Sequence, residues 1–250
     1  MALRWSEWLV ALAVVVGSLE LLAVRPAWSE QGTWRWSILR RELPGFGAIL
    51  GSGPFTLLLV SRAAAAGWLL VTPSLWALAW VWGASLLANL RFRGTWNGGS
   101  DHMLMVVLSG ALVARAGAGH EVLVTAGVAW IGVQGVLSYA IAGIAKLRSA
   151  AWRDGTALPV LLAIPAYGVP VRARRVFDNP RLARVAAWVV LAFECAFPLV
   201  LLHPVVAVMG CALAAAFHLG NAWVFGLNRF LLTWAATWPG IVAIATIRAG

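Results

Sequence analysis

A few polar side chains of this sequence lie inside long apolar stretches, and their types suit proton transfer. Lys146 and Glu194 each lie in such a stretch, and His218 and Asn221 share a third. Polar and ionisable groups are costly inside a bilayer, so each is a candidate functional residue. Because burial disfavours the ammonium form of lysine, we expect Lys146 to act as a base.

Helical spacing groups these residues with others. Tyr139 precedes Lys146 by two turns and shares its helix face, and Asn221 follows His218 by one turn. We expect histidines to shuttle protons and Asn221 to orient a substrate oxygen. The predicted catalytic residues are Lys146, His102 and His218, and the predicted substrate-binding residues are Asn221, Tyr139, Trp152, Glu194 and Asn97.

Each candidate also has a structural interpretation. Lys146 can extend to the lipid headgroups from its helix end, and either His102 or His218 can hydrogen-bond across helices. Glu194 can stay protonated or pair with a histidine of another helix. Asp101 is expected to be the N-cap of the helix that carries His102.

Several chemistries are disfavoured by the absence of their motifs. The sequence has no HExxH pattern, no phosphate-binding glycine loop and no GxSxG nucleophile motif. Cys195 and Cys211 lie in apolar runs without metal-ligand spacing. We therefore predict no metal.

The elements that position these residues are helices in a membrane. Apolar residues make up 62% of the 250 residues and charged residues 11%, against about 45–50% and 25% in soluble domains. The apolar runs are continuous, which favours helices over alternating barrel strands. The sequence predicts an all-α polytopic helical bundle with no soluble domain. Its first apolar stretch is expected to be a retained helix, since it lacks the pattern of a targeting peptide.

Eight spans are predicted from apolar runs between polar connections. Pro54, Arg62, Gly67 and Pro73 interrupt one long apolar region, so seven spans are an alternative. A proline-broken segment, 157–167, is too short to span and is expected to be re-entrant or interfacial. The predicted spans are 7–24, 46–62, 66–90, 102–117, 121–147, 184–202, 204–226 and 229–247.

Basic and aromatic residues mark the connections. Fifteen of the nineteen Lys and Arg residues fall on one side of an eight-span topology, the exceptions being Arg4, Arg62, Arg115 and Arg248. The positive-inside rule makes that side cytoplasmic, in a bacterial-type cytoplasmic membrane. Arginines of residues 172–184 precede a span, so membrane lipids are expected partners and nucleic acid is not. Tryptophans of the connections are expected to anchor at headgroups: Trp28, Trp34, Trp36, Trp96 and Trp152.

Three sequence blocks carry a family resemblance. They are 96–102 (WNGGSDH), 139–155 (YAIAGIAKLRSAAWRDG) and 217–230 (FHLGNAWVFGLNRF), and the pattern AGxxKLxxxxWxxG in the second is the most specific. The chain resembles the HTTM family, the membrane domain related to vitamin K-dependent gamma-glutamyl carboxylase. The resemblance is strongest over 46–247 and implies one domain over 1–250.

The resemblance implies a role for several residues. Lys146 matches the lysine that deprotonates vitamin K hydroquinone, and His102 matches a histidine that assists carboxylation. His218 and Asn221 match a pair near the quinone. The expected cofactor is a vitamin K-like quinone or hydroquinone, and the expected activity is carboxylase/epoxidase-like or another quinone-linked reaction. The related carboxylase has a peptide-docking domain beyond its membrane region, and we expect none in this chain, so a separate protein or peptide is the expected substrate partner.

Two other functions remain open at this stage. The polar cluster can hold helices together in a non-catalytic scaffold or accessory subunit. Alternatively, Glu194 and His218 can relay protons along a proton or small-solute pathway. The resemblance and the charge distribution also disagree on the side of the membrane at which the polar cluster lies. The related carboxylase works in the secretory lumen, whereas the arginines here place the cluster on the cytoplasmic side.

Overall fold

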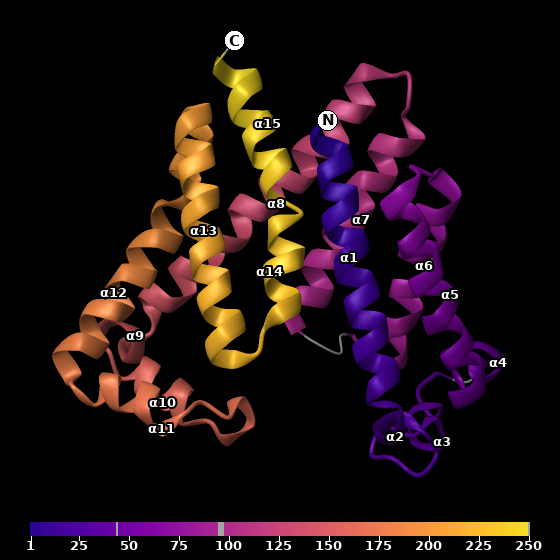
Figure 1. The fold of residues 1–250 in the computed structure, drawn as a ribbon, viewed down its shortest axis with the longest axis horizontal. Helices are drawn as coiled ribbons and strands as arrows, with labels where there is room; N and C mark the ends of the chain where they lie inside the picture. Colours follow the sequence, from indigo (N-terminus) through magenta and orange to yellow (C-terminus); the bar gives the residue numbers. More distant parts are fainter. Residues whose placement is uncertain (44, 95–97, 250) are drawn as a thin grey trace. The chain divides into compact units, whose positions relative to one another are not determined.

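The chain is an all-α integral membrane protein. The computed structural model describes residues 1–43, 45–94 and 98–249, and these form helices and turns without a strand (Figure 1). Six helical segments are long and apolar enough to cross a membrane, which confirms the predicted fold class but not the count of eight. These segments are Ala2–Ala23, Ser52–Val71, Glu121–Arg148, Pro180–Leu202, Pro204–Phe225 and Asn228–Ala249.

The first of two compact units comprises residues 1–131 and 232–240. In this unit α1 packs against α5 and α7, and α6 packs against the same two helices. Its apolar core includes Val14, Leu69, Leu78 and Leu108, all fully buried. The helices are α1 (Ala2–Ala23), α2 (Arg25–Trp28), α3 (Trp36–Leu39), α4 (Gly47–Leu50), α5 (Ser52–Val71), α6 (Leu75–Arg91), α7 (Gly98–Ala116) and the first part of α8 (Glu121–Arg148).

The predicted division at residues 62–66 is wrong. The helix α5 continues through Arg62 because the Arg62 Nε donates a hydrogen bond to Ser18 Oγ of α1 at 2.9 Å. The break falls instead around Pro73, which has no N–H to continue a helix and disfavours helical geometry in the residue before it. Ser74 then caps α6 by accepting a hydrogen bond from the Ala77 N–H at 3.2 Å.

A buried ion pair joins α1 to α7 within the first unit. Arg115 donates to both carboxylate oxygens of Glu7, with its Nε 2.9 Å from Oε1 and its Nη2 2.6 Å from Oε2. Because this pairing satisfies a fully buried carboxylate, Glu7 has a structural role. On α7 the predicted N-cap Asp101 is wrong: the helix begins at Gly98, so Asp101 lies inside its first turn, where a negative charge favours the helix dipole.

The predicted headgroup anchors Trp28 and Trp36 are buried instead. Trp28 is 0% exposed and donates its Nε1–H to the Leu21 carbonyl at 2.7 Å, and Trp36 is 7% exposed. Both belong to a second apolar core of the first unit that includes Phe55 and Phe92. Trp96 lies outside the described residues.

The second unit comprises residues 132–231 and 241–249 of the described chain. The predicted interfacial segment is a seven-residue helix, α10, followed by a single 3-10 turn. The predicted eighth helix is interrupted between α14 and α15, where Pro239 lacks an N–H. The elements are the rest of α8, α9 (Ala150–Asp154), α10 (Ala157–Ala163), η1 (Pro165–Tyr167), α11 (Val171–Arg175), η2 (Val176–Asp178), α12 (Pro180–Ala196), η3 (Phe197–Leu202), α13 (Pro204–Phe225) and parts of α14 (Asn228–Ala235) and α15 (Trp238–Ala249).

Within this unit α9 follows α8 after a turn at Ser149 and packs against α12. Arg184 and Trp188 of α12 donate side-chain hydrogen bonds to the carbonyls of Asp154 and Arg153, at 3.2 and 3.1 Å. Gly155 ends α9 with a φ of +89°, and a Cβ there would lie 2.5 Å from the Arg184 Cα. Glycine is therefore required at this turn both by conformation and by the close approach of α12.

Candidate functional site

A lysine and a glutamate pair between α8 and α12. Lys146 Nζ lies 2.8 Å from Glu194 Oε1 and 2.7 Å from Oε2. The glutamate side chain is 4% exposed and the lysine side chain 24%. The sequence identified both residues but did not pair them, and Glu194 pairs with the lysine instead of with a histidine.

Gly143 allows the two helices to approach closely enough for this pair. A Cβ at Gly143 would lie 2.8 Å from both the backbone N and the Sγ of Cys195, and 3.0 Å from the Glu194 carbonyl carbon. Two of these atoms are backbone and cannot move aside without shifting α12. The glycine, three residues before Lys146, therefore sets the spacing at which the lysine reaches Glu194.

Glu194 lies inside its candidate span, whereas Lys146 lies near the end of its own. Glu194 follows Pro180, the first residue of its span, by fourteen residues, which is about 21 Å at 1.5 Å per residue. Lys146 lies two residues before Arg148, the last residue of its own candidate span, and the chain then turns at Ser149 into α9, which packs on α12. Lys146 therefore has an anionic partner inside the protein, and its interpretation as a headgroup anchor stays a prediction.

Trp152 covers the lysine from α9. Lys146 Nζ lies 5.3 Å from the centre of the Trp152 ring, within the range of a cation–π contact. Two glycines, Gly143 and Gly155, lie close to α12. Lys146 forms the ion pair, and Trp152 contacts Lys146. These are four of the six fixed residues of the AGxxKLxxxxWxxG pattern, so most of the pattern describes how α8 and α9 contact α12.

A second polar pair is formed by Tyr139 of α8 and His218 of α13. The Tyr139 hydroxyl and His218 Nε2 share a buried hydrogen bond of 2.8 Å. Its direction depends on the tautomer of the histidine. Tyr139 and Lys146 lie on one face of α8, separated by about 10 Å along the helix axis.

Aromatic side chains surround the Tyr139–His218 pair. The Tyr139 ring lies 3.9 Å from that of Phe197 and 5.7 Å from that of Phe193, and Phe217 contacts both Phe193 and His218 at 5.4 and 5.2 Å between ring centres. The sequence analysis missed these phenylalanines. The one-turn spacing of Phe193 and Phe197 was an available signal, because it places both on one helix face.

The remaining predicted residues have different placements. Asn221 is half-buried on α13, one turn after His218. His102 is exposed on α7 in the first unit, and its grouping with Lys146 stays a prediction. Asn97 lies outside the described residues.

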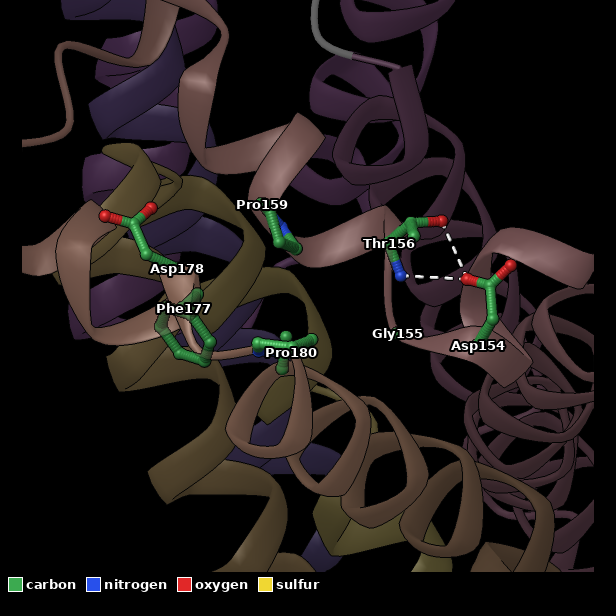
Figure 2. Close-up of a pocket in the computed structure, with 8 residues that line it drawn as sticks. Asp154, Gly155, Thr156, Pro159, Phe177, Asp178 and Pro180 are labelled. Atoms are coloured by element: carbon green, nitrogen blue, oxygen red, sulfur yellow. Dashed lines mark hydrogen bonds between the residues drawn. The ribbon is translucent and has the colours of Figure 1, made fainter.

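A pocket of about 310 Å³ lies at the turn between α9 and α10 (Figure 2). The Thr156 N–H and hydroxyl both donate to Asp154 Oδ1, at 2.9 and 2.7 Å. The backbone hydrogen bond, followed by the hydroxyl, lowers the pKa of Asp154 below its ordinary value. These bonds hold the turn in place. No predicted site residue lines the pocket, which is formed by Asp154, Gly155, Thr156, Pro159, Phe177, Asp178, Pro180 and Ala183.

Comparison of the chain with known protein families, curated proteins and solved structures finds no match.

Proposed function

We propose that this chain is a membrane enzyme that binds a lipid quinol and removes a proton from it with Lys146. The observation that carries the proposal is a buried carboxylate inside one candidate span that holds a lysine from the end of another. Ionisable groups at such a depth are costly and occur where function requires them. The resemblance to the HTTM family supports the same lysine and the same class of substrate.

The pair has two forms of equal net charge, an ammonium beside a carboxylate and an amine beside a carboxylic acid. An apolar environment disfavours both charges of the first form. In the second form, Lys146 Nζ has a lone pair that accepts the Glu194 O–H, and this hydrogen bond must be released before Nζ can take a proton from the quinol. The quinol O–H bond breaks, its proton goes to Nζ, and the electron pair stays on the oxygen as a quinolate. The resulting ammonium remains hydrogen-bonded to Glu194 and balances the quinolate charge.

The Tyr139–His218 pair and its aromatic neighbours provide the rest of the proposed site. Phenylalanine and tyrosine rings can stack against a quinol ring. The phenol and the imidazole can exchange their mutual hydrogen bond for one to a quinol oxygen. Asn221, one turn from His218, adds an amide that can orient the second oxygen. Carboxylation of a glutamate would need a separate peptide substrate.

The lipid that co-purifies with the protein tests the proposed quinol binding. Protein purified in mild detergent is expected to retain a lipid quinone or quinol close to one per chain, detected by chromatography and mass spectrometry. A Phe197→Ala and Phe217→Ala double variant should lose most of it, while Phe230→Ala, an aromatic removal at α14, should keep it. Stable protein from which no quinone is recovered, even after incubation with excess menaquinol-like lipid, would favour a scaffold in which the polar pairs join helices.

We also propose that the basic connections face the cytoplasm of a bacterial-type cell. Residues 149–179 lie on the same side of the membrane whether α6 and α7 are both counted as spans or both left out. The number of spans before residue 149 differs by two between these cases, and two spans return the chain to the same side. With α6 and α7 counted as spans, fifteen basic residues against four favour that side as cytoplasmic, and without them, when Arg91 and Arg93 fall on the other side, thirteen against six favour the same side.

Cysteine labelling in intact cells checks the orientation. In a background with Cys195 and Cys211 replaced by alanine, a membrane-impermeant maleimide should label Ala249→Cys and miss Ala173→Cys. Permeabilised cells should give both labels, which controls for reactivity. The reverse pattern in intact cells would contradict the orientation.

A further inference from the structure

The first unit contains a basic pocket in the connection between α1 and α5. The pocket has a volume of about 520 Å³, within the usual range of about 300–1,000 Å³ for small-molecule sites. This connection joins two candidate spans, and the pocket therefore lies outside the apolar segments of the chain. Its lining residues are Trp36, Arg40, Arg41, Leu43, Gly45 and Gly47.

A fully buried arginine fixes the tryptophan wall of this pocket. Arg91 donates to the carbonyls of Trp28 and Trp34, at 2.9 and 3.1 Å, and thereby ties the connection to α6. Its guanidinium carbon lies 5.4 Å from the Trp36 ring centre and 5.3 Å from that of Phe55. Trp36 is therefore held between the core and the pocket, and the pocket is built on an ordered base.

The carboxylates of the same connection are engaged elsewhere. Glu42 pairs with Arg93 at 2.9 Å. Glu30 accepts a hydrogen bond from the Ser52 hydroxyl at 3.2 Å and another from the Ser37 N–H at 3.4 Å. No carboxylate of the described residues forms an ion pair with Arg40 or Arg41, both of which are exposed. Arg40 and Arg41 therefore line the pocket without a carboxylate partner among the described residues.

We propose that this pocket binds the phosphate group of an anionic phospholipid. Guanidinium groups hydrogen-bond phosphate oxygens in a bidentate geometry. Trp36 and Leu43 give the pocket an apolar wall suited to the glycerol and the first methylenes of a lipid. A free phosphate ester offers the same anionic group without the apolar part, so the two sources are separable by experiment. The site is independent of the proposed quinol chemistry.

Native mass spectrometry of the full chain in detergent tests the proposal with defined probes. Phosphatidylglycerol is titrated against wild type, the Arg40→Gln and Arg41→Gln double variant, and a matched Arg172→Gln and Arg174→Gln double variant in the basic segment of the second unit. Each arginine contributes about a fivefold change in affinity for an anionic surface. The pocket variant should therefore bind about 30-fold more weakly, and the matched control should retain the tight site.

Three further measurements decide the outcome. Phosphatidylcholine, which carries a balancing ammonium, should bind wild type weakly. Glycerol 3-phosphate at millimolar concentration should leave the bound phosphatidylglycerol in place if the lipid is the ligand, whereas its displacement of the lipid would assign the same site to a soluble phosphate ester. Equal phosphatidylglycerol binding by wild type and the pocket variant, at unchanged unfolding temperature, would overturn the proposal.

Discussion

Replacing Lys146 with arginine is expected to keep the pair with Glu194 and to reduce quinol deprotonation by about 10²–10⁴-fold, the usual contribution of a general base. The guanidinium remains protonated and has no amine form, so it cannot accept a proton. Its charge still balances the buried carboxylate, so the unfolding temperature should stay close to that of wild type. The measurement is quinol-dependent turnover of purified protein beside thermal unfolding in the same detergent.

Two companion variants make this result specific. Lys146→Met leaves a buried carboxylate without a partner, which costs about 3–5 kcal/mol of unfolding free energy unless Glu194 takes up a proton. The ion pair therefore makes Lys146→Met less stable than Lys146→Arg. Glu194→Gln keeps the amine of Lys146 and should retain part of the activity. Full activity in Lys146→Arg together with none in Glu194→Gln would identify the carboxylate as the proton acceptor.

Replacing Gly143 with alanine is expected to separate α8 from α12. The added Cβ would meet Cys195 and Glu194 backbone atoms at 2.8–3.0 Å, so the helices must move apart. Overpacking of this kind lowers the unfolding free energy by about 1–3 kcal/mol, and the shift lengthens the Lys146–Glu194 contact. Quinol-dependent turnover and thermal stability should therefore fall together.

Gly220→Ala is the matched control, because no atom lies within 4 Å of its Cβ position on α13. Alanine is the better helix former, so this variant should be as stable as wild type or more so. If Gly143→Ala retains wild-type stability and turnover, the close approach of α8 and α12 does not determine the site.

The helices that the sequence predicts best are those with continuous apolar runs. The predicted limits 121–147 and 204–226 differ by one residue from α8 and α13. The predicted boundary between α5 and α6 was misplaced because an arginine in an apolar run indicates the end of a span. In the structure, Arg62 is buried inside α5 and hydrogen-bonds to Ser18. Such compensation depends on a neighbouring helix and is not visible along the chain.

The sequence likewise predicted the residues of the candidate site, but it did not predict which of them pair. Lys146, Glu194, Tyr139 and His218 are identifiable because polar groups are rare in apolar runs. The pairing of Lys146 with Glu194 depends on the close approach of α8 and α12 at Gly143, and the pairing of Tyr139 with His218 depends on the packing of α8 beside α13. Both are tertiary features. Trp36 was misassigned for the same reason, since Arg91, which buries it, is 55 residues away in the sequence.

The proton transfer itself can be observed in the absorption spectrum of a bound quinol. A hydroquinone and its anion absorb at different wavelengths, so binding of a lipid hydroquinone to reconstituted protein under anaerobic conditions at neutral pH reports its protonation state directly. We expect wild type to produce the anion spectrum in proportion to bound ligand, and Lys146→Arg to bind the ligand while leaving it neutral. A neutral ligand bound to wild type, or an anion of equal amount bound to the arginine variant, would contradict the role of Lys146 as the base.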